Sequence, residues 1–259
     1  MNHRKYNHLK QFNFDALTAD QQKFILEYEI EKANEQQRRR EILEEQAKKG
    51  VPIEKTKIVV DYDNVKKWFE QFYLKMFNKE FQYTEDNKLI MDLLFYYFAK
   101  DIRFEEFNPR FKLNKGIGII GSVGTGKTTT MQAFEMLGNN FFKAYKSPFF
   151  LFKINSCNKI SLEYQSREDK RDITNYCYGA RCFDDLGSEK NVFGDKSLME
   201  QILEQRYFEQ ITLRKQSNIT HFTTNLNLDE LALRYGDRVF DRLQEQCNFI
   251  PLNGASFRR

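Results

Sequence analysis

The stretch Gly121-Ser122-Val123-Gly124-Thr125-Gly126-Lys127-Thr128 decides the fold of this chain. It matches the pattern G-x-x-x-x-G-K-[ST], follows an apolar run at 116–120 and opens a helical run at 127–137. A strand, this loop and a helix are the setting that a phosphate-binding loop (P-loop) requires, whereas a turn that merely joins two elements does not need the full pattern. The glycines let successive backbone N–H groups point at phosphate oxygens, and the helix N-terminus favours negative charge. The candidate phosphate-binding residues are Gly121, Ser122, Val123, Gly124, Thr125, Gly126, Lys127, Thr128 and Thr129.

Two side chains of this loop have predicted roles of their own. Lys127 is expected to reach the β- and γ-phosphates of a nucleoside triphosphate. The Thr128 hydroxyl is expected to bind Mg²⁺, so the predicted cofactors are ATP and Mg²⁺.

The pattern of the chain changes near residue 114 to short apolar runs that alternate with helical runs. Such alternation predicts an α/β fold, with a parallel sheet flanked by helices on both faces and a ligand site at the carboxyl ends of the strands. The expected strands are Gly116–Ile120, Phe149–Ile154, Ala180–Phe183, Ile219–Thr223 and Phe249–Leu252. The expected helices of this part are Lys127–Leu137, Leu198–Arg214 and Leu228–Gln246.

A short apolar strand at 180–183 ends in the acidic pair Asp184 and Asp185. Taken alone this is a weak signal that also fits a turn or a helix cap, but after a P-loop it predicts a Walker B motif. We expect this strand beside the P-loop strand, with Asp184 in the Mg²⁺ shell and Asp185 orienting or deprotonating the attacking water. Aspartate stands at the second position where glutamate is commonest in such ATPases, which is expected to slow hydrolysis.

The strand predicted at 219–223 runs into Thr224 and Asn225. A polar side chain at this strand end can hold the attacking water near the γ-phosphate, the role called sensor 1, and we expect Asn225 to have it. The competing interpretation is that Thr224 and Asn225 cap the helix that starts near Leu228.

Arg238 and Arg242 lie four residues apart, on one face of a predicted helix. An arginine supplied to the γ-phosphate of a neighbouring subunit would stabilise transition-state charge. The alternative is a local ion pair with Asp237, Asp241 or Glu245.

Basic residues in two other segments have candidate roles. Arg258, in the segment after the last strand, could fold back onto the phosphates of its own subunit, and a disordered basic tail is the alternative. The segment between the second strand and Asp184, expected to be irregular, mixes basic and aromatic residues that could track single-stranded DNA or form a solvated surface. Its candidates are Lys159, Tyr164, Arg167, Lys170, Arg171 and Tyr176.

Composition limits the class of protein. The 259 residues are 41% hydrophobic and 30% charged, which allows a real core, and the formal net charge of +4 is too balanced to indicate nucleic-acid binding by itself. The four cysteines form no C-x-x-C pair, so neither a zinc site nor a disulfide framework is expected. With no signal peptide or membrane-spanning run in the sequence, we expect a cytoplasmic protein without membrane partners.

The first 110 residues are expected to be helical. Thr18 and Gln21 form a predicted capping box at the start of a charged helix that runs to about Lys49. It is either a solvated helix or a projecting helix that docks on a partner protein or touches nucleic acid. Two amphipathic helices, Asp61–Phe77 and Glu85–Lys100, are expected to pack on each other and on the nucleotide domain. We therefore expect a polar arm and charged helix at 1–50, a helical region at 51–110 as a candidate for partner docking, and the ATPase domain at 111–259.

Taken together these motifs resemble the AAA+ ATPases of the DnaC-type helicase-loader and IstB-like group. The resemblance covers roughly residues 110 to 259 and rests on five segments in the family's order. They are Gly121–Thr128, Cys182–Gly187, Thr223–Leu226, Tyr235–Leu243 and Ser256–Arg258.

The resemblance implies an AAA+ fold, ATP hydrolysis to ADP and phosphate, and self-association through bound ATP. It assigns Arg242 to the arginine-finger position, with Arg238 one turn before it, and Arg258 to the sensor-2 position. It also implies a DNA-replication factor that engages single-stranded DNA and a replicative helicase. The alternatives are a transposition helper that binds duplex DNA and a transposase, a nucleotide-binding adaptor with little hydrolysis and, more remotely, a small-molecule kinase.

Overall fold

The computed structural model falls into two units, Met1–Ile58 and Val59–Arg259. The residues that it describes are 17, 18, 20–25, 27, 58–165, 173–189, 198–213, 215 and 217–252. In the first unit the predicted capping box is confirmed, since Thr18 and Gln21 exchange hydrogen bonds between backbone N–H groups and side-chain oxygens. The remainder of the charged helix lies outside the described residues.

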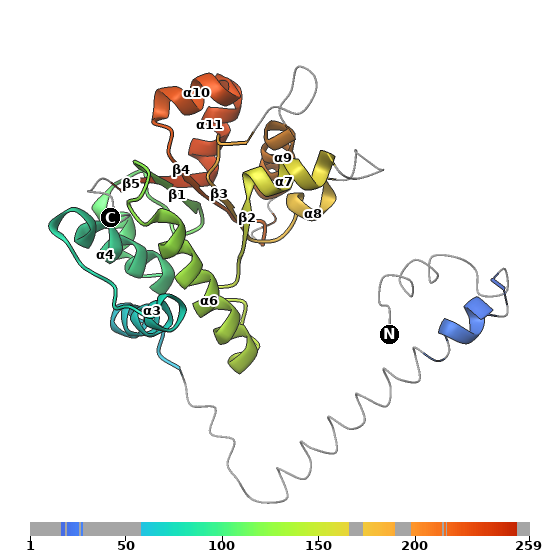
Figure 1. Ribbon diagram of the computed structural model, residues 1–259, viewed down its shortest axis with the longest axis horizontal. Helices are drawn as coiled ribbons and strands as arrows, with labels where there is room; N and C mark the ends of the chain where they lie inside the picture. Colours follow the sequence, from blue (N-terminus) through green and yellow to red (C-terminus); the bar gives the residue numbers. More distant parts are fainter. Residues whose placement is uncertain are drawn as a thin grey trace, which may run out of the picture. The chain divides into compact units, whose positions relative to one another are not determined.

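The second unit is built on five parallel strands in the order β2-β3-β4-β1-β5 (Figure 1). This confirms the predicted α/β fold with a parallel sheet. The strands are β1 (Gly116–Ile120), β2 (Lys153–Ser156), β3 (Arg181–Asp184), β4 (Thr220–Thr224) and β5 (Cys247–Pro251).

One expectation about the sheet is wrong. The strand that ends in Asp184 does not lie beside the P-loop strand, because β4 pairs with both and separates them. The register aligns Ile120 of β1 with Thr224 of β4. All strands run the same way, so the P-loop, the acidic pair and Asn225 follow three adjacent strands at one edge of the sheet.

Helices cover both faces of the sheet, as two neighbouring residues of β4 show. His221 contacts the rings of Phe98 and Phe152, on the face where α4 (Glu85–Ala99) and α6 (Lys127–Tyr145) pack. Phe222 belongs to the opposite core, together with residues from α7, α9, α10 and α11. Successive side chains of a strand point to opposite faces, so a strand buried on both faces must be apolar or hydrogen-bonded throughout. The bounds on this second face are α7 (Cys157–Gln165), α8 (Thr174–Cys177), α9 (Leu198–Tyr207), α10 (Leu228–Tyr235) and α11 (Asp237–Gln246).

The two predicted amphipathic helices pack as expected. Phe69 of α3 (Tyr62–Phe77) contacts the rings of both Phe95 in α4 and Phe134 in α6. The buried stripe of α3 is Val65, Phe69 and Tyr73, spaced four residues apart. Leu89 of α4 is 54% exposed, whereas its neighbours Ile90 and Met91 are buried.

Several element boundaries differ from those expected. The long helix predicted at 228–246 is two helices, separated by Gly236, which has φ 76°. The helix predicted at 198–214 is an α-helix only as far as Tyr207. The chain then forms a π-helical turn, Phe208–Thr212. The segment expected to be irregular before β3 contains α7 and α8, and a further short helix, α5 (Arg103–Phe107), precedes β1.

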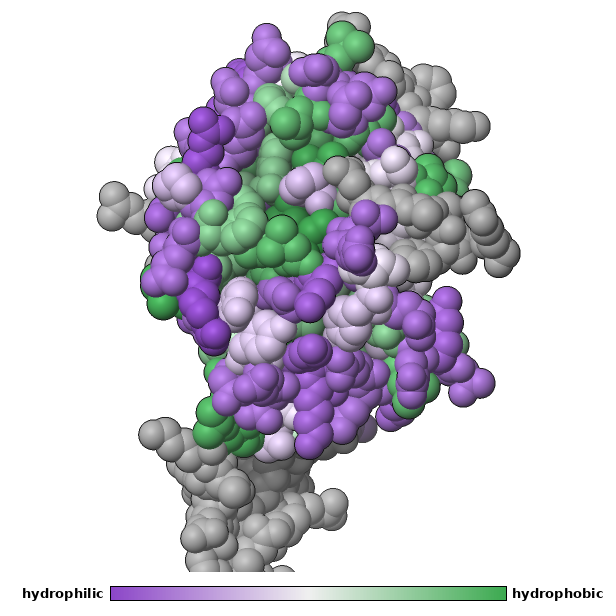
Figure 2. Space-filling view, turned by 90° about the vertical axis from the view of Figure 1, so that its left-hand side faces the viewer, coloured by the Kyte–Doolittle hydropathy of each residue, from purple (hydrophilic) through white to green (hydrophobic). Residues whose placement is uncertain are grey.

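The surface of this unit is chemically mixed. One face shows apolar side chains in its centre, bordered by polar ones (Figure 2).

The four cysteines are all buried free thiols. None of the helices described is both long enough and apolar enough for a transmembrane segment.

Candidate functional site

The P-loop leaves β1 and enters α6 with its glycines in conformations that only glycine adopts readily. Gly124 and Gly126 have φ values of 88° and 89°, in the left-handed region where a Cβ would be strained. Lys127 is the first residue of α6, so the unpaired N–H groups at the start of a 19-residue helix face the loop. The loop therefore has the backbone form that an anion site of this type needs.

The Lys127 side chain is folded into the loop rather than into solvent. The residue is only 4% exposed. Its ammonium donates to the carbonyl oxygens of Gly121 at 2.6 Å and Ser122 at 2.7 Å, and to Oδ1 of Asn225 at 2.7 Å. These three hydrogen bonds hold the ammonium at the mouth of the loop.

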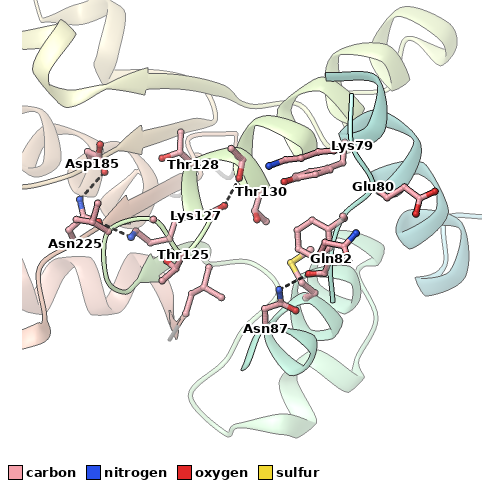
Figure 3. Close-up of a pocket in the computed structure, with 18 residues that line it drawn as sticks. Lys79, Glu80, Gln82, Asn87, Thr125, Lys127, Thr128, Thr130, Asp185 and Asn225 are labelled. Atoms are coloured by element: carbon pink, nitrogen blue, oxygen red, sulfur yellow. Dashed lines mark hydrogen bonds between the residues drawn. The ribbon is translucent and has the colours of Figure 1, made fainter. Parts of the chain in front are cut away.

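Asn225 connects the P-loop with the acidic pair (Figure 3). Its Oδ1 accepts from Lys127, and its Nδ2 donates to Oδ1 of Asp185 at 3.1 Å. The two partners fix the amide orientation, because an ammonium only donates and a carboxylate only accepts. Lys127, Asn225 and Asp185 form one hydrogen-bonded chain across the carboxyl ends of β1, β4 and β3.

Asn225 is not the cap of the following helix. The N-cap of α10 is Asn227, whose side chain accepts from the Glu230 N–H while the Glu230 carboxylate accepts from the Asn227 N–H. Thr224 instead donates to the carbonyl of Leu186. The capping alternative is therefore wrong for both residues, and Asn225 instead lines the cavity over the P-loop.

Asp184 and Thr128 meet at the predicted metal position. The Thr128 hydroxyl donates to Oδ1 of Asp184 at 2.8 Å, and the Thr223 hydroxyl donates to the same oxygen at 2.7 Å. Burial raises the pKa of Asp184, while these two hydrogen bonds act in the opposite direction. The donor set is all oxygen, which fits Mg²⁺, an ion commonly held by one or two carboxylates together with substrate phosphates. In the described residues no group of three or more His, Cys, Asp or Glu side chains could hold a metal ion.

Asp185 sits in a strained turn directly after β3. Its φ is +55°, which is uncommon for a residue with a Cβ. The Thr223 hydroxyl accepts from the Asp185 N–H at 3.0 Å and holds this conformation. The side chain lines the cavity beside Asn225.

A cavity of about 260 Å³ lies over the P-loop (Figure 3). One wall consists of loop residues 123–130 with Asp185, Asn225 and Leu252. The opposite wall comes from the helical region, and the sequence analysis did not predict it. Its residues are Tyr73, Lys79, Glu80, Phe81, Gln82, Asn87 and Met91.

The missed wall is held in place by Asn87. Its Oδ1 accepts from the Thr84 N–H and its Nδ2 donates to the Gln82 carbonyl at 2.9 Å, while Thr84 caps α4. The capping pattern of Thr84 and Asn87 was the one available sequence signal, and it predicts only a helix start. The position of this turn over the P-loop is a tertiary result.

Arg238 and Arg242 both lie on α11, away from this cavity. Neither is among the described residues that line it. The acid that they share is Glu204 of α9, 3.5 Å from Arg238 and 3.2 Å from Arg242, so the local pairs suggested by spacing are wrong. Arg242 also lies over the Tyr207 ring, while the Arg238 side chain is 70% exposed. Arg258 lies outside the described residues.

The predicted DNA-tracking segment is only partly described. Tyr176 is 6% exposed and belongs to the core beside α9, so it is not available for base stacking. Lys159 is exposed and lies 3.9 Å from Glu163 of its own helix, and Tyr164 is packed against the same core. Arg167, Lys170 and Arg171 lie outside the described residues.

Comparisons with known proteins gave matches of structure alone. No family model matches the chain, and no curated protein does. The structure of the DnaC helicase loader matches with 19% identity and a TM-score of 0.46, over 70% of this chain and 98% of that one. DnaI gives 19% and 0.46, over 70% of this chain and 93% of that one.

A third match is AMPPCP-bound DnaA from Aquifex aeolicus, with 19% identity, a TM-score of 0.41 and coverage of 66% of this chain and 48% of that one. These are likenesses of fold. On the strand order, the P-loop and the residues that follow β3 and β4, the chain has an α/β fold with a P-loop at the carboxyl edge of its parallel sheet.

Proposed function

We propose that this chain binds ATP with Mg²⁺ at the P-loop and hydrolyses it to ADP and phosphate. The observation that carries the proposal is the hydrogen-bonded chain from Lys127 through Asn225 to Asp185. It joins a phosphate-binding cation, a polar side chain and a carboxylate along the edge of one cavity. A site that only binds phosphate has no need of the last two groups.

Each residue then has a role in hydrolysis. The loop N–H groups and Lys127 bind the β- and γ-phosphates, and Thr128 and Asp184 hold Mg²⁺, which offsets charge on the phosphate oxygens. Asn225 orients a water molecule, and Asp185 accepts its proton as the water oxygen attacks the γ-phosphorus. The bond from the γ-phosphorus to the bridging oxygen breaks, and ADP leaves with the electron pair.

The site is proposed to be completed by a second copy of the chain. Arg238 and Arg242 are on a helix that does not border the cavity of their own subunit. An arginine from a neighbour would stabilise the charge that spreads over the γ-phosphate oxygens in the transition state. ATP bound between subunits would then hold the assembly together, and hydrolysis would loosen it.

The cellular role we propose is that of a DNA-replication factor of the helicase-loader kind. The order of the motifs from Gly121 to Arg258 supports this choice. The partners would be single-stranded DNA, a replicative helicase and further copies of the chain, with residues 1–110 available for helicase docking and 111–259 as the ATPase domain. Arg258 would contact the nucleotide in cis.

The test is the ATPase rate per subunit against protein concentration, with and without single-stranded DNA. A shared site predicts a rate that rises with concentration and with DNA, and that is lost in Lys127→Ala but kept in Lys88→Ala, an exposed lysine of α4. A flat, DNA-independent rate would overturn the shared site and favour the adaptor. Stronger binding of duplex than of single-stranded DNA would favour the transposition helper.

A further inference from the structure

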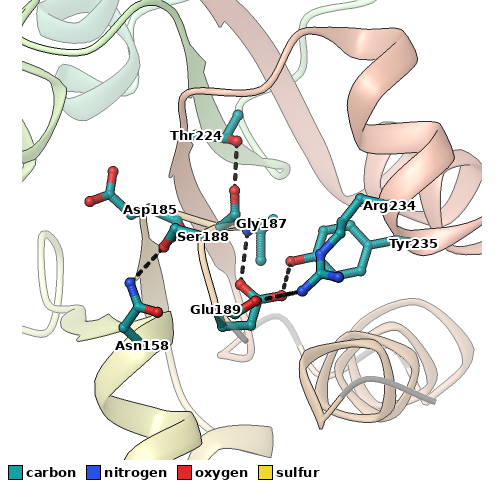
Figure 4. A network of polar contacts seen from close by, with 9 residues as sticks. Asn158, Asp185, Gly187, Ser188, Glu189, Thr224, Arg234 and Tyr235 are labelled. Carbon is teal, nitrogen blue, oxygen red and sulfur yellow. Dashed lines mark hydrogen bonds and ion pairs between the residues drawn. The ribbon is translucent and has the colours of Figure 1, made fainter. Parts of the chain in front are cut away.

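The turn after β3 carries a buried carboxylate that the ATPase proposal does not use. The side chain of Glu189 is only 1% exposed, and a buried charge must be paired or hydrogen-bonded. Its partners come from two places (Figure 4). The Gly187 N–H donates to Oε2 at 2.9 Å, and the Tyr235 hydroxyl donates to Oε1 at 2.6 Å. Arg234 Nη2 donates to the Glu189 carbonyl at 2.6 Å and lies 3.5 Å from Oε1.

On one side of this contact is a turn that is fastened to the sheet. The Leu186 N–H donates to the Thr223 carbonyl at 2.8 Å, and the Thr224 hydroxyl donates to the Leu186 carbonyl at 2.6 Å. The Ser188 hydroxyl closes the turn onto the Asp185 carbonyl at 2.6 Å. Asp185 and Glu189 are therefore two ends of one turn whose position is set by β4.

On the other side of the contact is the end of α10. Tyr235 is its last residue, and after Gly236 the chain enters α11, which carries Arg238 and Arg242. Burial and the Glu189 carboxylate raise the pKa of Tyr235 well above its usual range, so its hydroxyl stays a donor. The hydrogen bonds to Glu189 fix the direction in which α10 ends, and hence where α11 begins.

We propose that Glu189 is a positioning residue: through Tyr235 and Arg234 it sets α11, and the arginines on it, relative to the turn that holds Asp185. This inference rests on the proposed shared site and deepens it. This role explains why an acid is buried here. A subunit presents its arginines to a neighbour from α11, and Glu189 holds α11 against the turn after β3 of the same subunit. The effect should fall on the arginines that a subunit donates, because the turn is independently fixed by β4.

The experiment separates the donor of the arginine from the owner of the site. Asp185→Asn subunits have intact arginines and a disabled site, whereas Arg242→Ala subunits have an intact site and no finger. When the two variants are mixed with ATP and single-stranded DNA, turnover is restored only at a site where an Asp185→Asn subunit donates its arginine to an Arg242→Ala subunit. Tyr235→Phe is then added to one subunit type at a time. This substitution removes the hydroxyl that Glu189 holds and keeps the ring.

We expect at least a fivefold loss of turnover when Tyr235→Phe is in the Asp185→Asn donor, and less than a twofold loss when it is in the Arg242→Ala owner. Affinity for a fluorescent ATP analogue should be unchanged. Tyr176→Phe is the matched control, because it also removes a tyrosine–glutamate hydrogen bond, to Glu163, but one that joins α8 to α7 rather than α10 to the turn after β3. It should leave both mixtures unchanged.

Equal losses in the two arms, or none in the donor arm, would overturn the inference. An inactive mixture of the two parent variants would instead overturn the shared site itself, and the inference with it. If Tyr235→Phe does not fold, Arg234→Lys makes the same test, because lysine keeps the charge and loses the planar fork.

Discussion

Lys127 and Asn225, 98 residues apart, are joined by a hydrogen bond of 2.7 Å from the ammonium to the side-chain carbonyl. The bond determines which way the amide faces, and so directs its NH₂ group at Asp185. A γ-phosphate bound by Lys127 would therefore meet an amide that is already oriented toward the acid.

Asn225→Ala should lower kcat about 100- to 1,000-fold, the range for removing one preorganised polar group from a transition state. ATP affinity should change less than threefold, because the P-loop is untouched. Single-turnover hydrolysis and equilibrium binding measure the two separately. A loss of affinity as large as the loss in kcat would assign Asn225 to binding instead.

Asn227→Ala is the matched variant two residues away, and it should affect stability rather than turnover. It removes the N-cap of α10 and should lower the free energy of unfolding by about 1 kcal/mol. Turnover at low temperature should stay near that of the parent. Urea unfolding and an ATPase assay on the same preparations would check both expectations.

Arg242→Ala should reduce turnover about a thousandfold or more if it acts as a finger in trans, with ATP affinity nearly intact. Glu204→Gln should instead raise turnover at low protein concentration. It removes the acid that holds Arg238 and Arg242, a partly exposed contact of the kind that contributes up to about 1 kcal/mol. The protein concentration at half-maximal ATPase rate should then fall by up to about fivefold. A large loss of ATP affinity in dilute Arg242→Ala would mean that the arginine acts in cis.

Asn87→Ala should weaken nucleotide binding through the wall of the cavity opposite the P-loop. It releases the Gln82 carbonyl and half of the α4 capping box, so the turn at 79–84 loses its fixed position. ATP should bind about 3- to 10-fold more weakly, which corresponds to the loss of roughly one hydrogen bond. Inorganic triphosphate should bind as before, because its contacts are with the P-loop. Thr84→Ala keeps the Asn87–Gln82 bond and should therefore affect helix stability more than ATP affinity.

His221 should make stability depend on pH. Burial, with Lys100 and Arg206 nearby, lowers its pKa to about 3, and its Nδ1 accepts from the Ile117 N–H. The folded chain therefore keeps a neutral imidazole, whereas the unfolded chain binds a proton below its ordinary pKa of about 6.5. The free energy of unfolding should rise with pH between about 3 and 6.5, by at most about 1.4 kcal/mol per pH unit from this residue.

The measurement is urea unfolding between about pH 4.5 and pH 7. His221→Asn retains an acceptor for Ile117 and does not titrate, so its stability should fall less steeply toward acid. An identical slope in the two proteins would mean that other groups control the pH dependence.

The sequence alone determined the α/β fold and most of the candidate site residues at the carboxyl edge of the sheet. A P-loop pattern is local: the glycines and Lys127 are adjacent in the chain, and their backbone requirements do not depend on distant contacts. The acidic pair and Asn225 were predicted because each follows a buried strand, and parallel strands bring their carboxyl ends together. That argument fixes the edge of the sheet on which residues lie.

The order of the strands within the sheet, the wall formed by Asn87 and Gln82, and the pairing of Arg242 with Glu204 were decided only by tertiary structure. Each depends on contacts between segments far apart in the chain, where neither spacing nor periodicity carries information. Glu189 is the clearest case: its three partners come from its own turn and from α10, 45 and 46 residues further along. In the sequence Glu189 is one more charged residue of a loop. Only the packing shows that it is buried between the turn after β3 and α10.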